Sequence, residues 1–288
     1  MAPSERKTIG LSAGVAAVAS SFSRIGAFNA LAPRDPAERA GQGVAYGSDP
    51  MQALDVYAPV NATGPTPVVI FFHGGGWRTG RRQEYGFAGR ALASRGFLTL
   101  VAGYRLVPQI RYPTFLEDAA AAARWAVSHA AEFGGDPARL ALVGHSAGAY
   151  ISLQLGLDTS YLRAAGVDPA TVRAMVGLSG PYSFLPLKSP ATTATFSAAE
   201  DLEATQPINH VRADAPPALL IHGGRDTAVN AGQTVRMGRA LTGASAVAEV
   251  RIFQDLTHSD TVLALSRPFR HKAPILDEMT AFLKTHIV

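Results

Sequence analysis

The sequence predicts an α/β protein in which helices cover both faces of a mostly parallel sheet, and two observations lead to this prediction. First, short and wholly apolar runs such as Val68–Phe72 and Leu140–Val143 are typical of parallel strands that are buried on both faces. Second, these runs alternate regularly with longer helix-like segments, which is the order expected of a parallel sheet. With 288 residues the chain is long enough to form one large domain.

The individual elements are expected in the following order. Leu54–Ala58 alternates apolar and polar side chains, as in a half-buried antiparallel strand at a sheet edge. Pro113 suits the first turn of a long Ala-rich helix that continues to Glu132 and stops at Gly134. The other strands are expected at 97–102, 174–178, 218–221 and 247–253, and the other helices at 84–95, directly after residue 146, near 230–242 and at 274–286.

Two segments lie outside this alternation. Residues 181–216 are rich in Pro, Ser and Thr and are expected to form an inserted loop or small cap at the strand ends. Residues 1–43 precede the main domain at 44–288, and within them Arg6 and Lys7 come before a mild apolar stretch. That stretch fits a weak export signal and a helix over the active-site mouth equally well, so a cytoplasmic and an exported location both remain open. It is too short and too mild to span a bilayer.

The composition excludes several classes of protein. The absence of cysteine removes disulfides, thiolate metal sites and a cysteine nucleophile. The net charge of +4 is spread along the chain without a basic stripe or a recognition motif, which argues against nucleic-acid binding. Because 47% of the residues are apolar and only 17% are charged, a large buried core is expected.

The pattern G-x-S-x-G occurs twice, around Ser12 and around Ser146. A nucleophile elbow needs a buried strand before the serine and a helix after it, because the tight turn between them lifts the hydroxyl out of the sheet. Ser146 has the apolar run Leu140–Val143 before it and a helix-like segment after it, whereas Ser12 has neither. Ser146 is therefore the candidate nucleophile, and the match at Ser12 is attributed to chance.

A serine hydroxyl needs a general base, and the base needs a carboxylate that orients it. Asp226 and His258 each follow an apolar run that is expected to be a strand, and they come after Ser146 in the order serine, acid, histidine. They are the candidate acid and base, with Asp255 and Asp260 as the alternative acids.

The remaining histidines fit structural roles better. His145 is expected to pack beside the elbow, and both His271 in a basic run and His286 in the last helix are expected on the surface.

A glycine-rich segment, His73–Trp77, follows the strand at 68–72. Attack on a carbonyl creates an oxyanion that must be stabilised by preorganised N–H donors, and glycines let the backbone present such donors without obstruction. Gly75 and Gly76, together with the N–H of Ala147 just after the nucleophile, are the candidate oxyanion hole.

As a set, these motifs resemble the hormone-sensitive-lipase-like carboxylesterases of the α/β-hydrolase superfamily and their relatives. The resemblance covers roughly residues 44–288 and is carried by HGGGW at 73–77, GHSAG at 144–148 and the run Tyr104–Pro108. The relatives include short-chain esterases, feruloyl and acetyl esterases that act on xylan, and kynurenine formamidase, whose H-G-G-x-W pattern is also satisfied. The resemblance implies the same triad and the same oxyanion hole.

At two places the sequence differs from the usual motifs of this group, and both differences bear on the subfamily. The acid lies in Gly224-Arg-Asp226-Thr without the D-P-L run of the lipase-like branch, and His258 follows Thr257 where a glycine is commoner. The leading hypothesis is a serine carboxylesterase that cleaves small or short-chain esters through an acyl-enzyme, without a metal or cofactor. An amidase or formamidase on the same triad is the alternative enzyme, and a non-catalytic relative that binds a small ligand is the alternative of another class.

Overall fold

The computed structural model describes residues 25–26, 28–29 and 32–287, so the apolar stretch near the N-terminus and Ser12 lie outside the described residues. An eight-stranded sheet forms its centre, with the strand order β1-β2-β4-β3-β5-β6-β7-β8. The strands are β1 (Glu38–Ala45), β2 (Ala53–Ala58), β3 (Thr66–Phe72), β4 (Leu98–Ala102), β5 (Gly135–His145), β6 (Val172–Leu178), β7 (Ala218–Gly223) and β8 (Ala248–Phe253). The prediction of a mostly parallel sheet is confirmed, because only β2 runs against its neighbours.

The strand at 53–58 differs from its prediction in its place in the sheet and in being more than half-buried. It is antiparallel as expected, but it is not the edge strand, because β1 pairs with its outer side. Five of its six residues are buried, whereas the residues of β1 are mostly exposed. β1 has no apolar run that could identify it in the sequence, and it begins at Glu38, ahead of the expected domain start at residue 44.

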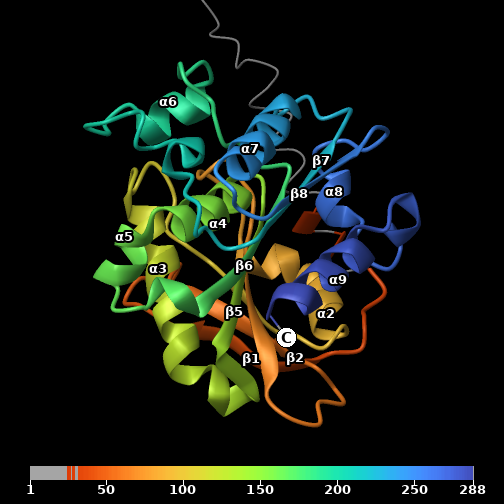
Figure 1. Cartoon of the computed structure of the whole chain (residues 1–288). Helices are drawn as coiled ribbons and strands as arrows, with labels where there is room; N and C mark the ends of the chain where they lie inside the picture. The colour runs from red at the N-terminus through yellow and green to blue at the C-terminus, as the bar shows by residue number, and fades with distance from the viewer. Residues whose placement is uncertain (1–24, 27, 30–31, 288) are drawn as a thin grey trace, which may run out of the picture.

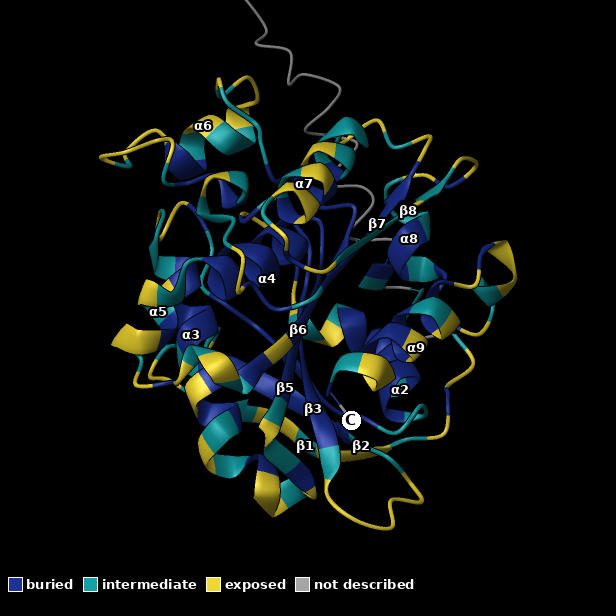
Figure 2. Ribbon diagram, in the orientation of Figure 1, coloured by how far each residue is buried: buried dark blue, intermediate teal, exposed yellow. Residues whose placement is uncertain are grey.

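Helices cover both faces of the sheet, as Figure 1 shows. Helices α2 (Gly86–Ala93), α8 (Asp260–Leu263) and α9 (Ile275–Ile287) pack on one face, where they form a common apolar core with the sheet. Helices α3 (Thr114–His129), α4 (Ala147–Leu157), α5 (Thr159–Ala164) and α7 (Gly232–Gly243) cover the other face. Figure 2 shows most of the inner strands, from β2 to β7, and the sheet-facing sides of these helices as buried, with exposed residues at the periphery.

The insert at 181–216 contains a short helix, α6 (Pro190–Phe196), and a 3-10 turn, η4 (Pro207–His210). In Figure 1 this insert lies beside α4 and α7, at the end of the sheet where β6 and β7 finish. Tyr150 and Gln154 of α4 donate side-chain hydrogen bonds to the carbonyls of Thr205 and Ala204, which hold the insert on the body of the protein. In the described part of the chain, every helix is too short or too polar to cross a membrane.

Candidate active site

Ser146 stands in a sharp turn between β5 and α4, at the carboxyl edge of the sheet. Its backbone has φ 55° and ψ −118°, a conformation that costs a non-glycine residue about 1–3 kcal/mol and therefore requires support from its surroundings. The support is close packing at two glycines. A Cβ atom at Gly144 would collide with the carbonyl of Gly148, and a Cβ at Gly148 would collide with the carbonyl of Phe72. Both glycines of the motif are thus required by geometry.

A continuous chain of hydrogen bonds joins the three residues that the sequence singled out. Ser146 Oγ lies 2.9 Å from His258 Nε2, and His258 Nδ1 lies 2.7 Å from Asp226 Oδ2. With Asp226 ionised, Nδ1–H donates to the carboxylate, which leaves the lone pair of Nε2 to accept from the serine hydroxyl. The structure therefore brings Ser146, His258 and Asp226 together in the order that nucleophilic catalysis by serine needs.

The carboxylate of Asp226 is surrounded by donors. Its Oδ1 accepts from the backbone N–H groups of Ala228 and Val229, each at 2.9 Å. Its Oδ2 accepts from His258 and also from His222 Nε2, at 3.0 Å. Burial by itself would raise the pKa of Asp226, but hydrogen bonds from His222 and His258 outweigh it and hold the pKa below its usual value. Asp226 is therefore ionised throughout the neutral range.

The loop that carries His258 is fixed by a different carboxylate. Asp260 Oδ2 accepts from both the N–H and the hydroxyl of Thr257, and Asp260 Oδ1 forms an ion pair with Lys272. None of these contacts involves the imidazole ring of His258, so Asp260 organises the loop. Asp255, the other alternative acid, is exposed. The geometry favours Asp226 over both.

His145 is packed beside the elbow, as expected from the sequence, and it holds the loop of His258 in place. Its Nε2 lies 3.0 Å from the carbonyl oxygen of His258, and a ring nitrogen facing a carbonyl must carry the proton. Burial lowers the pKa of His145 to about 3, so the ring is neutral at neutral pH. His145 thus faces the backbone of His258 and makes no contact with the Ser146 hydroxyl that would suit a base.

The glycine-rich loop lies beside the elbow, following β3. In the part of the chain that the structure describes, the N–H groups of Gly75 and Gly76 have no acceptor, and a Cβ at Gly76 would meet no atom within 4 Å. The N–H of Ala147 is at the first position of α4, where a helix leaves it without a partner. These are the free donors that an oxyanion hole requires.

Two buried side chains support this loop. His73 Nδ1 donates to the carbonyl of Gly74 at 2.8 Å, and Tyr104 donates its hydroxyl to the carbonyl of His73, also at 2.8 Å. The rings of His73 and Tyr104 are stacked with centroids 4.3 Å apart. Burial lowers the pKa of His73 to about 4, so this ring is neutral and has a structural role in supporting the loop.

An aromatic cluster adjoins the loop and the elbow. It consists of Trp77, Tyr150, Phe184 and Phe196. Trp77 lies edge-on to Phe196, with centroids 4.9 Å apart, and to Tyr150, at 5.3 Å. Phe184 packs on Phe196 at 5.1 Å. Because Phe184 and Phe196 belong to the insert and Trp77 follows Gly76, this cluster joins the insert to the glycine-rich loop.

One residue of the site was missed in the sequence. His222 lies inside β7, and a buried histidine in an apolar strand is usually a structural residue. Its position four residues before a candidate acid, at the carboxyl end of a strand, was the available signal. The histidines expected on the surface take no part in the site: His271 is exposed, and the ring of His286 packs on Phe282.

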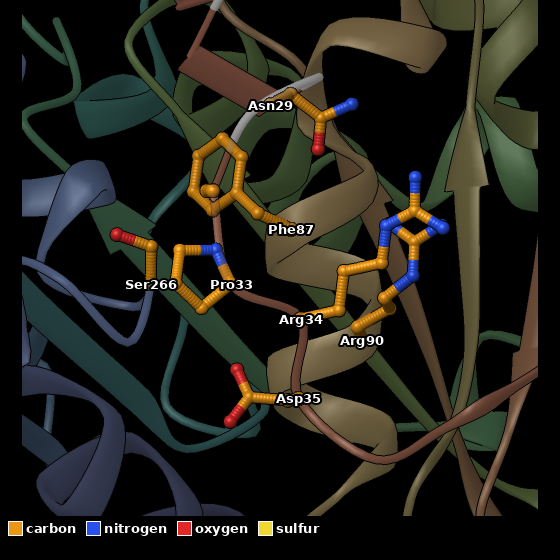
Figure 3. Close-up of a pocket in the computed structure, with 8 residues that line it drawn as sticks. Asn29, Pro33, Arg34, Asp35, Phe87, Arg90 and Ser266 are labelled. Atoms are coloured by element: carbon orange, nitrogen blue, oxygen red, sulfur yellow. The ribbon is translucent and has the colours of Figure 1, made fainter.

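Other hollows of the molecule lie away from these residues. The pocket in Figure 3, where Arg34 and Arg90 lie near each other beside α2, has a volume of about 10 Å³. That is space for about one water molecule, so it cannot receive a substrate. A groove of about 880 Å³ runs between α3 and α5, and none of its lining residues belongs to the triad or the glycine-rich loop. Among the described residues, no group of three or more His, Asp or Glu side chains is arranged to hold a metal ion.

Solved structures share this architecture, which is the α/β-hydrolase fold. Esterase B from Lactobacillus rhamnosis superimposes with a TM-score of 0.79 at 22% identity, over 96% of each chain. A thermostable esterase from Pseudomonas putida superimposes with a TM-score of 0.76 at 21% identity, over 97% of this chain and 93% of that one. The BD-FAE family model matches residues 54–241, and the chain belongs to this family.

The curated relatives are esterases as well. Esterase LipC of Mycobacterium tuberculosis is 34% identical over 206 residues, which are 65% of this chain and 51% of that protein. Isoprenylcysteine alpha-carbonyl methylesterase of Arabidopsis thaliana is 28% identical over 262 residues, which are 83% of this chain and 61% of that protein. The matched region thus spans little more than half of the length of these relatives.

Proposed function

We propose that this protein is a serine carboxylesterase that hydrolyses small or short-chain esters through an acyl-enzyme. The observation that carries the proposal is the hydrogen-bond chain from Ser146 Oγ through His258 to Asp226, with distances of 2.9 and 2.7 Å. The esterase relatives and the free donors next to Ser146 support the same chemistry.

The reaction would run in two halves. Ser146 Oγ attacks the ester carbonyl carbon while its proton passes to His258 Nε2, and the resulting oxyanion accepts hydrogen bonds from Gly75, Gly76 and Ala147. The carbon–oxygen bond to the alcohol then breaks as His258 returns that proton to the departing oxygen. In the second half, His258 takes a proton from water, the hydroxide attacks the acyl-enzyme, and Ser146 is regenerated with release of the acid.

The rate should depend on pH through His258. His258 must be neutral to accept the serine proton, so kcat/KM should rise as the pH increases from about 5 to about 8. Two neighbours do not contribute to this rise: the pKa of His145 is lowered by burial to about 3, and the pKa of Asp226 is held below its usual value. Initial rates with a p-nitrophenyl ester, corrected for spontaneous hydrolysis, provide the measurement. A flat profile over this range would argue against a histidine base.

The enzyme should prefer short acyl chains. The insert offers one helix of seven residues as a lid, and its Phe184 and Phe196 pack against Trp77, next to the glycine-rich loop. Each buried methylene contributes about 0.8 kcal/mol only where protein surface receives it. We therefore expect kcat/KM in a p-nitrophenyl series to peak at acyl chains of about two to six carbons, without activation at a lipid–water interface. Efficiency that keeps rising with long-chain esters would contradict this prediction.

A substrate panel tests the proposed function. It contains short p-nitrophenyl esters, an isoprenylcysteine methyl ester, an acetylated and a feruloylated sugar, and N-formylkynurenine. We expect efficient turnover of the short p-nitrophenyl esters and the acetylated sugar, and much slower turnover of the isoprenylcysteine methyl ester and the feruloylated sugar, because their acyl groups are large. Turnover of N-formylkynurenine with none of the esters would instead identify a formamidase on the same machinery. Binding without turnover across the panel would identify a non-catalytic relative.

A further inference from the structure

We propose that His222, a buried histidine at the end of β7, is a positioning residue that holds Asp226 in the orientation His258 requires. The inference rests on the proposed function, since it concerns the same triad. Figure 1 shows β7 and β8 side by side, and the acid and the histidine lie on the loops that follow these two strands. His222 lies within β7 itself, so it is fixed by the sheet.

The location of the proton on His222 follows from its neighbours. Nε2 lies 3.0 Å from Asp226 Oδ2 and 3.0 Å from the carbonyl oxygen of Val229. Both partners are acceptors, so Nε2 must carry a hydrogen, which is directed at the Val229 carbonyl and also lies close to Asp226 Oδ2. On the other side of the ring, Nδ1 lies 2.7 Å from the hydroxyl of Thr234, a buried residue in the first turn of α7. The ring is thus held at both nitrogens.

The consequence is that one oxygen of Asp226 lies between two imidazoles. Oδ2 accepts from His258 on one side and from His222 on the other, while the two backbone N–H groups hold Oδ1. A carboxylate held by the backbone alone could still twist about its terminal torsion, which is broad. The donor from His222 removes that freedom and directs Oδ2 towards His258 Nδ1.

His222 also helps to fix the position of the loop that carries Asp226 relative to the sheet. By donating to Val229, it draws the far end of the acid loop back to the sheet, while Gly224 and Arg225 bond to the carbonyls of Phe253 and Leu256 in the strand and loop that lead to His258. The titratable groups that face this cluster are Asp226, His258 and His145, and burial keeps His145 neutral. Removal of the His222 donor therefore acts on the Asp226–His258 pair.

Two substitutions separate positioning from packing. His222→Met removes the donor while keeping a long side chain, and His222→Gln restores an N–H near the place of Nε2. In the full-length protein with a short p-nitrophenyl ester, we expect His222→Met to lower kcat about 10-fold to 100-fold, the range for losing a hydrogen bond to a charged group. KM should stay within about threefold, because substrate binding is not involved. The acid limb of kcat/KM should move to higher pH, since Asp226 with one donor fewer attracts the His258 proton more strongly.

Further variants make the outcome decisive. His222→Gln should recover most of the lost kcat, and Thr234→Val, which leaves Nε2–H in place, should cause a smaller loss in the same direction. His129→Gln changes a histidine on α3 whose ring, among the described residues, bonds only to the carbonyl of Trp125, and it should leave kcat unchanged. If His222→Met does not fold, the kcat values of His222→Gln and Thr234→Val, each compared with the wild type, still test the inference. A folded His222→Met with wild-type kcat and pH profile, or a Gln variant no better than Met, would overturn the inference.

The proposed function has a separate readout in the wild type. A fluorophosphonate that labels Ser146, together with ester turnover, supports the function whatever the His222 variants do. An inactive and unlabelled wild type would overturn the function and the inference with it.

Discussion

Replacing Ser146 by alanine should lower kcat by roughly a million-fold, the order seen when the serine of a comparable triad is removed. Only one hydroxyl is lost. The backbone bond from the N–H of Ser146 to Leu178 and the bond from Tyr150 to the Ser146 carbonyl both remain. The strained turn stays held by Gly144 and Gly148, so the melting temperature should change little. Hydrolysis of a short p-nitrophenyl ester and circular dichroism during heating provide the two measurements.

The sequence supplies a matched control for this substitution. Ser12 stands in the same G-x-S-x-G pattern, and Ser12→Ala should leave kcat and KM unchanged. If purified Ser146→Ala retained more than about one part in a hundred of the wild-type rate, the loss would fall far short of that for a nucleophile, and Ser146 would be removed from the mechanism.

Asp226→Asn should lower kcat by about ten-thousand-fold, as in related triads where the amide no longer supports the required histidine tautomer. The surroundings make this site unusually intolerant of an amide. All four neighbours of the carboxylate donate hydrogen bonds, so the NH₂ group of an asparagine would face donors in either orientation. We therefore also expect a loss of about 1–3 kcal/mol in the free energy of unfolding.

Two other carboxylates serve as comparisons for Asp226. Asp255→Asn should be nearly silent, because Asp255 is exposed. Asp260→Asn should weaken the contacts to Thr257 and Lys272 and so cost less activity than Asp226→Asn. A nearly silent Asp226→Asn beside a severe Asp260→Asn would identify Asp260 as the acid.

Most of the fold could be predicted because buried parallel strands are marked by local composition. Val68–Phe72 and Leu140–Val143 are apolar on both faces, and Gly134 ends the preceding helical segment with a φ of 79°. β1 could not be predicted, because an exposed edge strand needs no apolar run and is stabilised by its pairing with β2. The same missing information led to the wrong prediction that Leu54–Ala58 lies at the edge.

The positions of Ser146, Asp226 and His258 could be predicted because each follows a strand, and the carboxyl ends of parallel strands meet at one edge of the sheet. Contacts between loops are not marked by a comparable pattern in the sequence. The bond from His145 to the carbonyl of His258 joins residues that are far apart in the sequence, and the contact between His222 and Asp226 depends on how the loop after β7 turns back on the strand. Both are properties of the folded chain, so these two contacts became visible only in the structure.

The most direct test of the proposed serine mechanism is covalent trapping of the nucleophile. The wild-type protein is treated with a fluorophosphonate, and the intact mass and the labelled peptide are measured in parallel with Ser146→Ala. We expect one adduct per chain, located on Ser146, with complete loss of esterase activity, and no adduct on the alanine variant. An adduct on another serine, or full activity after Ser146 is labelled, would contradict the assignment of Ser146 as the nucleophile.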